Sequence, residues 1–128
     1  MSEPRGPDPV LDALNLRLRR FAAGRDWDRF HSPKNLAMAF IVEAAELVEH
    51  FQWLTDAESV SLPQGTRKEV ELELADVLNY TVRLADKLGI DLPEAVDKKI
   101  ALNEQKYPAE QVRGSVKKHT EYREKEIS

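Results

Sequence analysis

At residues 36–46 the sequence reads Leu36-Ala-Met-Ala-Phe-Ile-Val-Glu-Ala-Ala-Glu46. Its first seven residues are apolar, and two glutamates three positions apart follow directly. On an α-helix this spacing places Glu43 and Glu46 on one face, one turn apart. The preceding Ser32-Pro33 is a typical helix start, with serine as the N-cap and proline in the first turn. We therefore predict a helix from Pro33 to about Trp53, whose apolar half is buried on more than one side.

A second acidic pair, Glu73-Leu-Ala-Asp76, follows about thirty residues later. It lies in a helix expected over about residues 66–88, so its two carboxylates also share one face. Clustered carboxylates repel one another unless a cation neutralises them. Four carboxylates from two adjacent helices would form a set of hard oxygen ligands, which Mg²⁺ prefers. The sequence therefore predicts a magnesium site made by Glu43, Glu46, Glu73 and Asp76.

The alternative to a metal site is that these acids are ordinary solvent-exposed residues. The chain is 33% charged, and a single Glu-x-x-Glu pair is common on exposed helices. Two such pairs, each within apolar sequence, make a shared site an equal alternative to simple exposure. The sequence contains no Glu-x-x-His motif, which counts against the di-iron carboxylate proteins.

The composition limits the class of protein. The chain has 128 residues, the usual size of one domain, and no cysteine, which excludes disulfides and thiolate metal sites. Its longest apolar run has seven residues, far fewer than a membrane span, and the N-terminus lacks the apolar core of a signal peptide. The net charge of −4 disfavours nucleic acid as a partner. We expect a soluble, cytoplasmic protein with no nucleic-acid or membrane partner.

The remaining segments predict two further helices and no strand. One helix is expected from Pro9 to Ala23, where apolar residues recur at helical spacing. The other is expected from near Pro93 to just before Pro108, with Asp91 as its cap. The prediction is therefore an all-α protein of four helices.

The non-helical segments set the predicted domain boundaries. Residues 1–8 are interpreted as a flexible N-terminal arm, residues 55–65 as a loop and residues 109–128 as a charged, flexible tail. The helical domain then spans residues 9–108.

Several other side chains are candidates for binding a ligand. On the second helix Glu43 and Glu46 share a stripe with His50 and Trp53, and on the third helix the acids share a face with Tyr80 and Arg83. The candidates for holding a base or phosphates are Trp27, His31, Trp53, Tyr80, Lys99 and Asn103. Each has an ordinary alternative as a core aromatic, a capping residue or a solvated helix face.

Three stretches resemble the MazG-like all-α nucleotide pyrophosphohydrolases, in particular their dCTP pyrophosphatase branch. The resemblance covers roughly residues 14–115, and Lys99 through Asn103 to Tyr107-Pro108 also fits it. The stretches are Arg25-Asp-Trp-Asp-Arg-Phe-His-Ser-Pro-Lys-Asn-Leu36, Glu43-Ala-Ala-Glu-Leu-Val-Glu-His-Phe-Gln-Trp53 and Glu73-Leu-Ala-Asp-Val-Leu-Asn-Tyr80.

The resemblance implies a magnesium-dependent enzyme that cleaves a nucleoside triphosphate, dCTP or a related pyrimidine deoxynucleotide, to the monophosphate and pyrophosphate. It implies that the four acids bind Mg²⁺, with Glu43 or Glu46 orienting or deprotonating the attacking water. It also implies a homotetramer built as a dimer of dimers, with the site near a subunit interface. The residues that it places at the nucleotide are Trp27, Trp53, Tyr80, Lys99 and Asn103.

One position departs from the pattern of the family. Animal members carry a histidine that contacts substrate nine residues before the tryptophan that matches Trp27, and this sequence has Leu18 there. The expected base preference is therefore less strict than in the animal members. The alternative from another functional class is a non-catalytic helical oligomerisation module whose acids bind structural cations.

Overall fold

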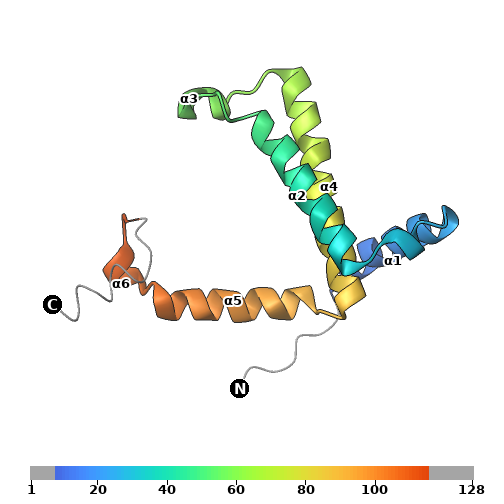
Figure 1. Cartoon of the computed structure of the whole chain (residues 1–128). Coiled ribbons are helices and arrows are strands. Elements are labelled where there is room, and N and C mark those ends of the chain that lie inside the picture. The colour runs from blue at the N-terminus through green and yellow to red at the C-terminus, as the bar shows by residue number, and fades with distance from the viewer. Residues whose placement is uncertain (1–7, 116–128) are drawn as a thin grey trace. The chain divides into compact units, whose positions relative to one another are not determined.

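The computed structural model describes residues 8–115, and within this range the regular structure is helical, with no strand. The all-α prediction is confirmed. The predicted N-terminal arm and most of the predicted tail lie outside the described residues. The elements are α1 (Pro9–Gly24), η1 (Asp28–Phe30), α2 (Pro33–Glu49), α3 (Asp56–Ser59), α4 (Gln64–Leu88), α5 (Leu92–Lys106) and α6 (Ala109–Val112) (Figure 1).

The described chain divides into two units, and the boundary between them along the sequence lies between Ile90 and Asp91. The first unit holds α1, η1, α2, α3 and α4, and the second holds α5 and α6. In the second unit α5 starts at the predicted cap, because the carboxylate of Asp91 accepts a hydrogen bond from the amide of Glu94. The predicted division into an arm, a domain over residues 9–108 and a tail stays a prediction, although α6 shows that the first tail residues are helical.

In the first unit α2 and α4 form a helical hairpin, and α1 also packs against α4 (Figure 1). Side chains from the three helices make a small core, because α1 and α2 each turn part of their apolar side toward α4. The carboxylate of Asp8 and the hydroxyl of Ser32 cap the first turns of α1 and α2. The buried apolar residues are Ala22, Leu36, Val70, Val82 and Ala85.

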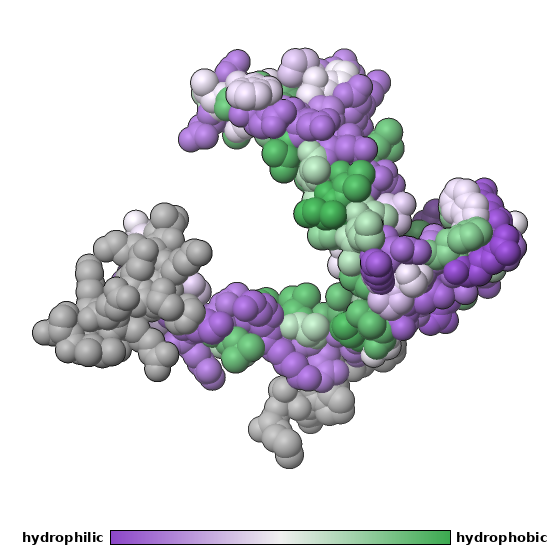
Figure 2. Space-filling model, viewed as in Figure 1, coloured by the Kyte–Doolittle hydropathy of each residue, from purple (hydrophilic) through white to green (hydrophobic). Residues whose placement is uncertain are grey.

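The predicted burial of the apolar half of α2 is only partly present within one chain. Leu36 is buried, but Met38, Ile41 and Val42 are 57%, 60% and 54% exposed. Hydrophobic residues gather along the middle of α2 in the space-filling view (Figure 2). A contiguous exposed apolar surface of this kind marks a contact with another surface. The predicted second subunit therefore stays a prediction.

The end of the helix before the hairpin loop was predicted wrongly. α2 ends at Glu49 rather than near Trp53, because the amides of His50 and Phe51 bond to carbonyls three residues back and close the helix. Trp53 therefore does not continue the stripe of Glu43 and Glu46.

The segment predicted as a loop contains the short helix α3. Its signal was present in the sequence, since Thr55 and Glu58 form a capping box in which each side chain bonds to the other residue's amide. Within the described residues, no helix combines the length and the apolar character that a bilayer span requires.

Candidate functional site

The four predicted acids lie on the facing helices of the hairpin, where α2 and α4 pack together. The pKa of Glu43 is raised, chiefly by burial and then by the charge of Glu46 and a hydrogen bond with it. The charges of Asp76 and Glu73 raise it further, so the other three carboxylates all act on Glu43. Within residues 8–115, however, no three acidic or histidine side chains converge closely enough to hold a metal ion.

His50 lies beside this acidic cluster. Its Nε2 atom is 2.8 Å from Oε2 of Glu73, and its Nδ1 atom is 3.8 Å from Oε2 of Glu69. The buried Oε2 atom of Glu73 has no hydrogen-bond partner, so the approach of His50 is close without having the direction of a hydrogen bond. A buried carboxylate oxygen without a partner is costly, and a cation would supply the missing interaction.

These observations test the predicted metal chemistry. The donors are carboxylate oxygens, one of them buried without a hydrogen-bond partner, and burial followed by the neighbouring negative charges raises the pKa of Glu43. Hard divalent cations such as Mg²⁺ prefer such donors. The donor set therefore fits a hard divalent cation in chemical type, while the arrangement in the single chain is more open than a closed coordination shell.

A cavity of about 570 Å³ lies between α1, the segment after it and α4. It has the size of ordinary small-ligand sites. Four of the predicted site residues contribute to its wall: Trp27, His31, Asp76 and Tyr80. Leu18, the position that departs from the family pattern, also lines it.

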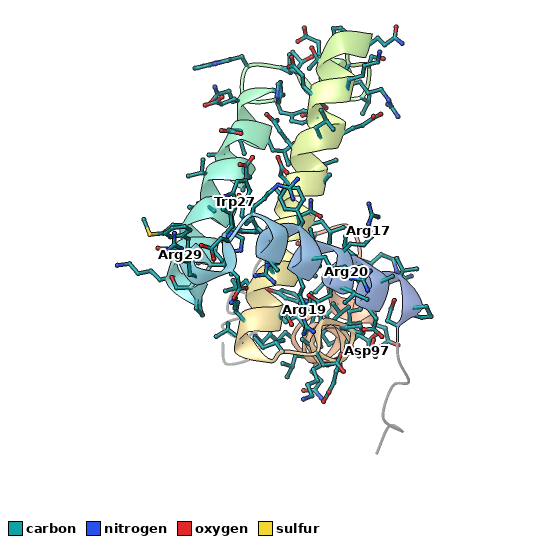
Figure 3. All side chains as sticks on the ribbon, turned by 90° about the vertical axis from the view of Figure 1, so that its right-hand side faces the viewer. Arg17, Arg19, Arg20, Trp27, Arg29 and Asp97 are labelled. Atoms are coloured by element: carbon teal, nitrogen blue, oxygen red, sulfur yellow. The ribbon has the colours of Figure 1, made fainter. Side chains whose placement is uncertain are left out.

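Trp27, whose side chain is labelled in Figure 3, lines the cavity with its aromatic ring. Its ring meets Phe21 edge to face, with 5.7 Å between the ring centroids, and the guanidinium of Arg25 lies 3.7 Å from the Phe21 ring centre. Asp26 has a φ of 53°, which turns the chain so that the Trp27 amide donates to the carbonyl of Ala22. The indole remains 46% exposed and offers a flat surface for stacking.

Tyr80 connects the cavity to the acidic cluster. Burial raises the pKa of its phenol, and the charges of Glu43 and then Asp76 raise it further. Asp76 itself lines the cavity. Asp76 is therefore the member of the acidic cluster that reaches the cavity lined by Trp27.

Arg83 is buried at the cavity wall, with 4% of its surface exposed. Its Nη2 atom donates to Oδ1 of Asp28 at 2.9 Å and lies 3.3 Å from Nδ1 of His31. Its Nη1 atom donates to Oδ2 of Asp86 at 3.3 Å. Because Asp28 and His31 flank η1, these contacts fix the segment that carries Trp27 against α4.

The other predicted substrate-binding residues lie outside the lining of this cavity or belong to the second unit. Trp53 is 86% exposed and does not line it. Lys99 and Asn103 lie on α5, in the second unit, where Asn103 lines a separate small cavity of about 340 Å³ with Ile100 and Tyr107.

Three polar residues of the cavity wall, namely Arg17, Asn79 and Arg83, were not predicted as site residues, although Arg83 was placed on the same helix face as the acids. Asn79 and Arg83 follow Asp76 by three and seven positions, so the helical stripe that begins at the acid was the signal. Arg17 adjoins the apolar stripe of α1, and nothing in its spacing singles it out.

Comparison with known proteins identifies the family of this chain. The family model for MazG-like proteins matches residues 39–122. The chain belongs to the MazG-like family. Human dCTP pyrophosphatase 1 is 44% identical over 119 residues, which cover 90% of this MazG-like chain and 69% of that protein. The Bos taurus protein of the same name is 40% identical over 116 residues, which cover 89% and 69%.

A solved structure supports the same assignment. The crystal structure of a pyrophosphatase from Archaeoglobus fulgidus DSM 4304 is similar to this MazG-like chain with a TM-score of 0.72 and 39% sequence identity. The match covers 84% of this chain and 99% of that one. The family resemblance seen in the sequence is therefore confirmed, together with the helical architecture.

Proposed function

We propose that this chain is a magnesium-dependent nucleoside triphosphate pyrophosphohydrolase that acts on pyrimidine deoxynucleotides and prefers dCTP. The coarser class, a nucleotide pyrophosphohydrolase enzyme, follows from family membership and from relatives named dCTP pyrophosphatase 1. The names of these relatives give no support to the non-catalytic alternative. The metal ion and the base preference are the proposed part.

One observation carries the proposal: Asp76 belongs both to the acidic cluster and to the wall of the cavity. A nucleotide has a flat base and a polyanionic tail, so its site needs an aromatic surface and a cation site within one molecule's length. Trp27 and Tyr80 supply aromatic surface in a cavity of about 570 Å³. The carboxylates adjacent to Tyr80 supply the place for a cation.

The acidic cluster is proposed to bind magnesium together with the triphosphate. A triphosphate brings about four negative charges, so without a cation its approach to four carboxylates is repulsive. Glu43, Glu46, Glu73 and Asp76 are the residues that would hold Mg²⁺. When bound, Mg²⁺ neutralises charge on the phosphates and lowers the pKa of water.

The side chains have distinct roles in the proposed hydrolysis. Glu43 or Glu46 orients the attacking water and accepts its proton. The water oxygen forms a bond to the α-phosphorus, and the bond from that phosphorus to the bridging oxygen breaks. Pyrophosphate leaves with the bridging oxygen, and the nucleoside monophosphate remains.

Base recognition is assigned to the opposite part of the cavity. Trp27 offers a stacking surface, which is worth on the order of 1–3 kcal/mol per base but distinguishes poorly between bases. Polar groups at the base edge must therefore supply selectivity, and His31 lies in the same wall. Leu18 brings no polar group there, which supports a preference less strict than in the animal relatives.

The protein is also proposed to act as a homo-oligomer, a dimer of dimers. The exposed apolar residues of α2 support this, because a single chain leaves Met38, Ile41 and Val42 more than half exposed. Trp53, Lys99 and Asn103 stay proposed substrate-binding residues on the strength of the family resemblance alone.

Pyrophosphate release from dCTP, dUTP, dTTP, dATP and dGTP, each with and without Mg²⁺, tests the proposed function. We expect release that depends on Mg²⁺ and is fastest with dCTP. If a purine triphosphate is the best substrate, the assignment to dCTP is wrong although the enzyme class stands. If no triphosphate is cleaved with either Mg²⁺ or Mn²⁺, the proposed function fails.

A further inference from the structure

Arg83 is a buried cation at the cavity wall, and the chemistry described above gives it no role. Its guanidinium contacts Asp28 and His31 beside η1, and Asp86 on its own helix. Through Asp86 the contacts extend to α1, where Arg19 and Asn15 donate to the same carboxylate.

The contact between Arg83 and His31 fixes the tautomer of the imidazole. An arginine side chain has only donors, so the Nδ1 atom that lies 3.3 Å from Nη2 must be an acceptor. In a neutral imidazole one nitrogen accepts and the other carries the hydrogen. The contact is therefore a hydrogen bond only in the tautomer that carries its hydrogen on Nε2.

The surroundings also keep His31 neutral. Its pKa is lowered, chiefly by burial and then by the charge of Arg83, with a smaller contribution in the same direction from Lys87. The charge of Asp28 acts in the opposite direction. Asp28 is itself paired with Lys87 at 2.8 Å and with Arg83 at 2.9 Å, which reduces its effect on the imidazole.

The segment that carries His31 is held from both ends. The His31 amide donates to the carbonyl of Asp28, and Nδ2 of Asn35 donates to the carbonyl of Phe30 at 2.9 Å. Since His31 and Arg83 both line the cavity with Trp27, the imidazole is a fixed part of its wall.

We propose that Arg83 is a positioning residue that selects the base, because it holds His31 in the tautomer whose Nε2–H group serves as a hydrogen-bond donor to the nucleobase. This inference rests on the proposed function and names the recognition chemistry within it. The matching ligand class is a base with a carbonyl oxygen at the edge that faces His31, which the pyrimidines possess. Adenine has ring-nitrogen acceptors but no carbonyl oxygen, so it is the natural comparison.

The state of the ring is tested on the full-length protein without any substrate. A long-range ¹H–¹⁵N spectrum reports which ring nitrogen carries hydrogen. The sequence contains three histidines, and His31→Gln assigns the signal of His31. We expect hydrogen on Nε2 in the wild type. In Arg83→Met we expect a mixture of tautomers and a higher pKa for His31, because the nearby cation is gone.

Selectivity is tested by kcat/KM for dCTP and for dATP. Arg83→Met should lower the ratio of the two values by about 10-fold, the size expected for one lost polar contact to the base. Arg19→Met is the matched control, because it removes another cation from Asp86 but does not touch His31. This control should keep the wild-type ratio.

Arg83→Lys guards against a folding failure of Arg83→Met. Lysine keeps a positive charge near Asp28 and Asp86 but lacks the planar fork that reaches several partners at once. Circular dichroism should show that Arg83→Lys is folded. The ¹H–¹⁵N spectrum should then show the same mixture of tautomers as in Arg83→Met, and the ratio of kcat/KM for dCTP to that for dATP should fall in the same way.

The outcomes separate this inference from the proposed function. Hydrogen on Nδ1 in the wild type, or an unchanged ring spectrum in a folded Arg83 variant, overturns the positioning role. An equal fall of the ratio in Arg19→Met overturns it as well, since the effect would then belong to the network as a whole. Absence of cleavage by the wild type overturns the proposed function and the base-selecting role with it, whereas the spectrum alone decides whether Arg83 sets the tautomer.

Discussion

The guanidinium of Arg19 donates through both Nε and Nη2 to the carboxylate of Asp86, which joins α1 to α4. This pairing has two consequences. It adds an ion pair to the packing of α1 on α4, and it favours the ionised form of Asp86 strongly.

Asp86 should make the stability of the fold depend on pH in the acidic range. Its pKa is lowered from 3.8 to about 2, chiefly by Arg19. Because the pKa of Asp86 is lower in the folded state, its contribution to the free energy of unfolding is complete above the unfolded-state pKa near 3.8. This contribution is lost as the pH falls toward about 2. Because Arg19 is partly exposed, we expect a contribution on the order of 1–2 kcal/mol to the free energy of unfolding.

Denaturant unfolding between pH 2 and pH 6 measures this contribution, and Asp86→Asn should remove it. Asp26→Asn is the matched control, because Asp26 forms an exposed surface pair with Arg29. Equal pH dependence in the wild type and Asp86→Asn would contradict the prediction.

Asp76→Asn should abolish activity without weakening the fold. The substitution keeps the shape of the side chain but removes one ligand charge, so we expect kcat/KM to fall by more than about 100-fold. Without metal the free energy of unfolding should be unchanged or slightly higher, since repulsion among the acids is relieved. The same result is expected for Glu46→Gln. Glu49→Gln, on the exposed side of α2, is the control that should turn over normally.

Binding of a non-hydrolysable dCTP analogue should require a divalent cation. Without one, a triphosphate in the cavity meets Asp76 and the negative charge of the acidic cluster to which Asp76 belongs. Calorimetry with Mg²⁺, with Ca²⁺ and with neither distinguishes the cases, and Ca²⁺ is expected to support binding without turnover. Equally tight binding in the absence of any divalent cation would argue against the acidic cluster as a metal site.

Trp27→Ala should raise KM for every triphosphate by a similar factor. A stacking contribution on the order of 1–3 kcal/mol corresponds to a loss of roughly 5-fold to 150-fold, with little change in the ratio between bases. Phe30→Ala is the control, because Phe30 is 55% exposed and does not line the cavity. A change confined to one base would assign Trp27 to edge recognition instead of stacking.

Ile41→Glu should reduce the size of the assembly. The side chain is 60% exposed in one chain, so a charge there should disturb a contact between copies more than the fold of a monomer. Light scattering and circular dichroism measured together should show a smaller, still helical species. Val10→Glu, at a 76% exposed position on α1, should leave the size unchanged. A wild-type protein that is monomeric at micromolar concentration would refute the predicted assembly.

The helices could be predicted because their signals are local. Ser32 and Asp91 accept the capping bonds expected of them, and Gly89 ends α4 with a φ of 66°. The end of α2 was missed because apolar and aromatic residues continue past Glu49, and only the backbone bonds of His50 and Phe51 show that the helix has closed.

The site could be predicted where its residues share a helix face and not where it depends on contacts distant in the sequence. The two acidic pairs needed only the helical period. Arg83 contacts Asp28 and His31 across more than fifty residues of sequence, and no local pattern reveals such a contact. Trp53 was placed on the acid stripe because helix continuation was assumed.

The two tryptophans of this chain occupy opposite environments. Trp27 is 46% exposed against Phe21 in the cavity, whereas Trp53 is 86% exposed after the end of α2. Indole fluorescence depends on solvent exposure and on stacked neighbours, so the two rings should emit at different wavelengths. In Trp53→Phe a single emitter remains, and quenching of its signal would report occupation of the cavity in real time, without any turnover.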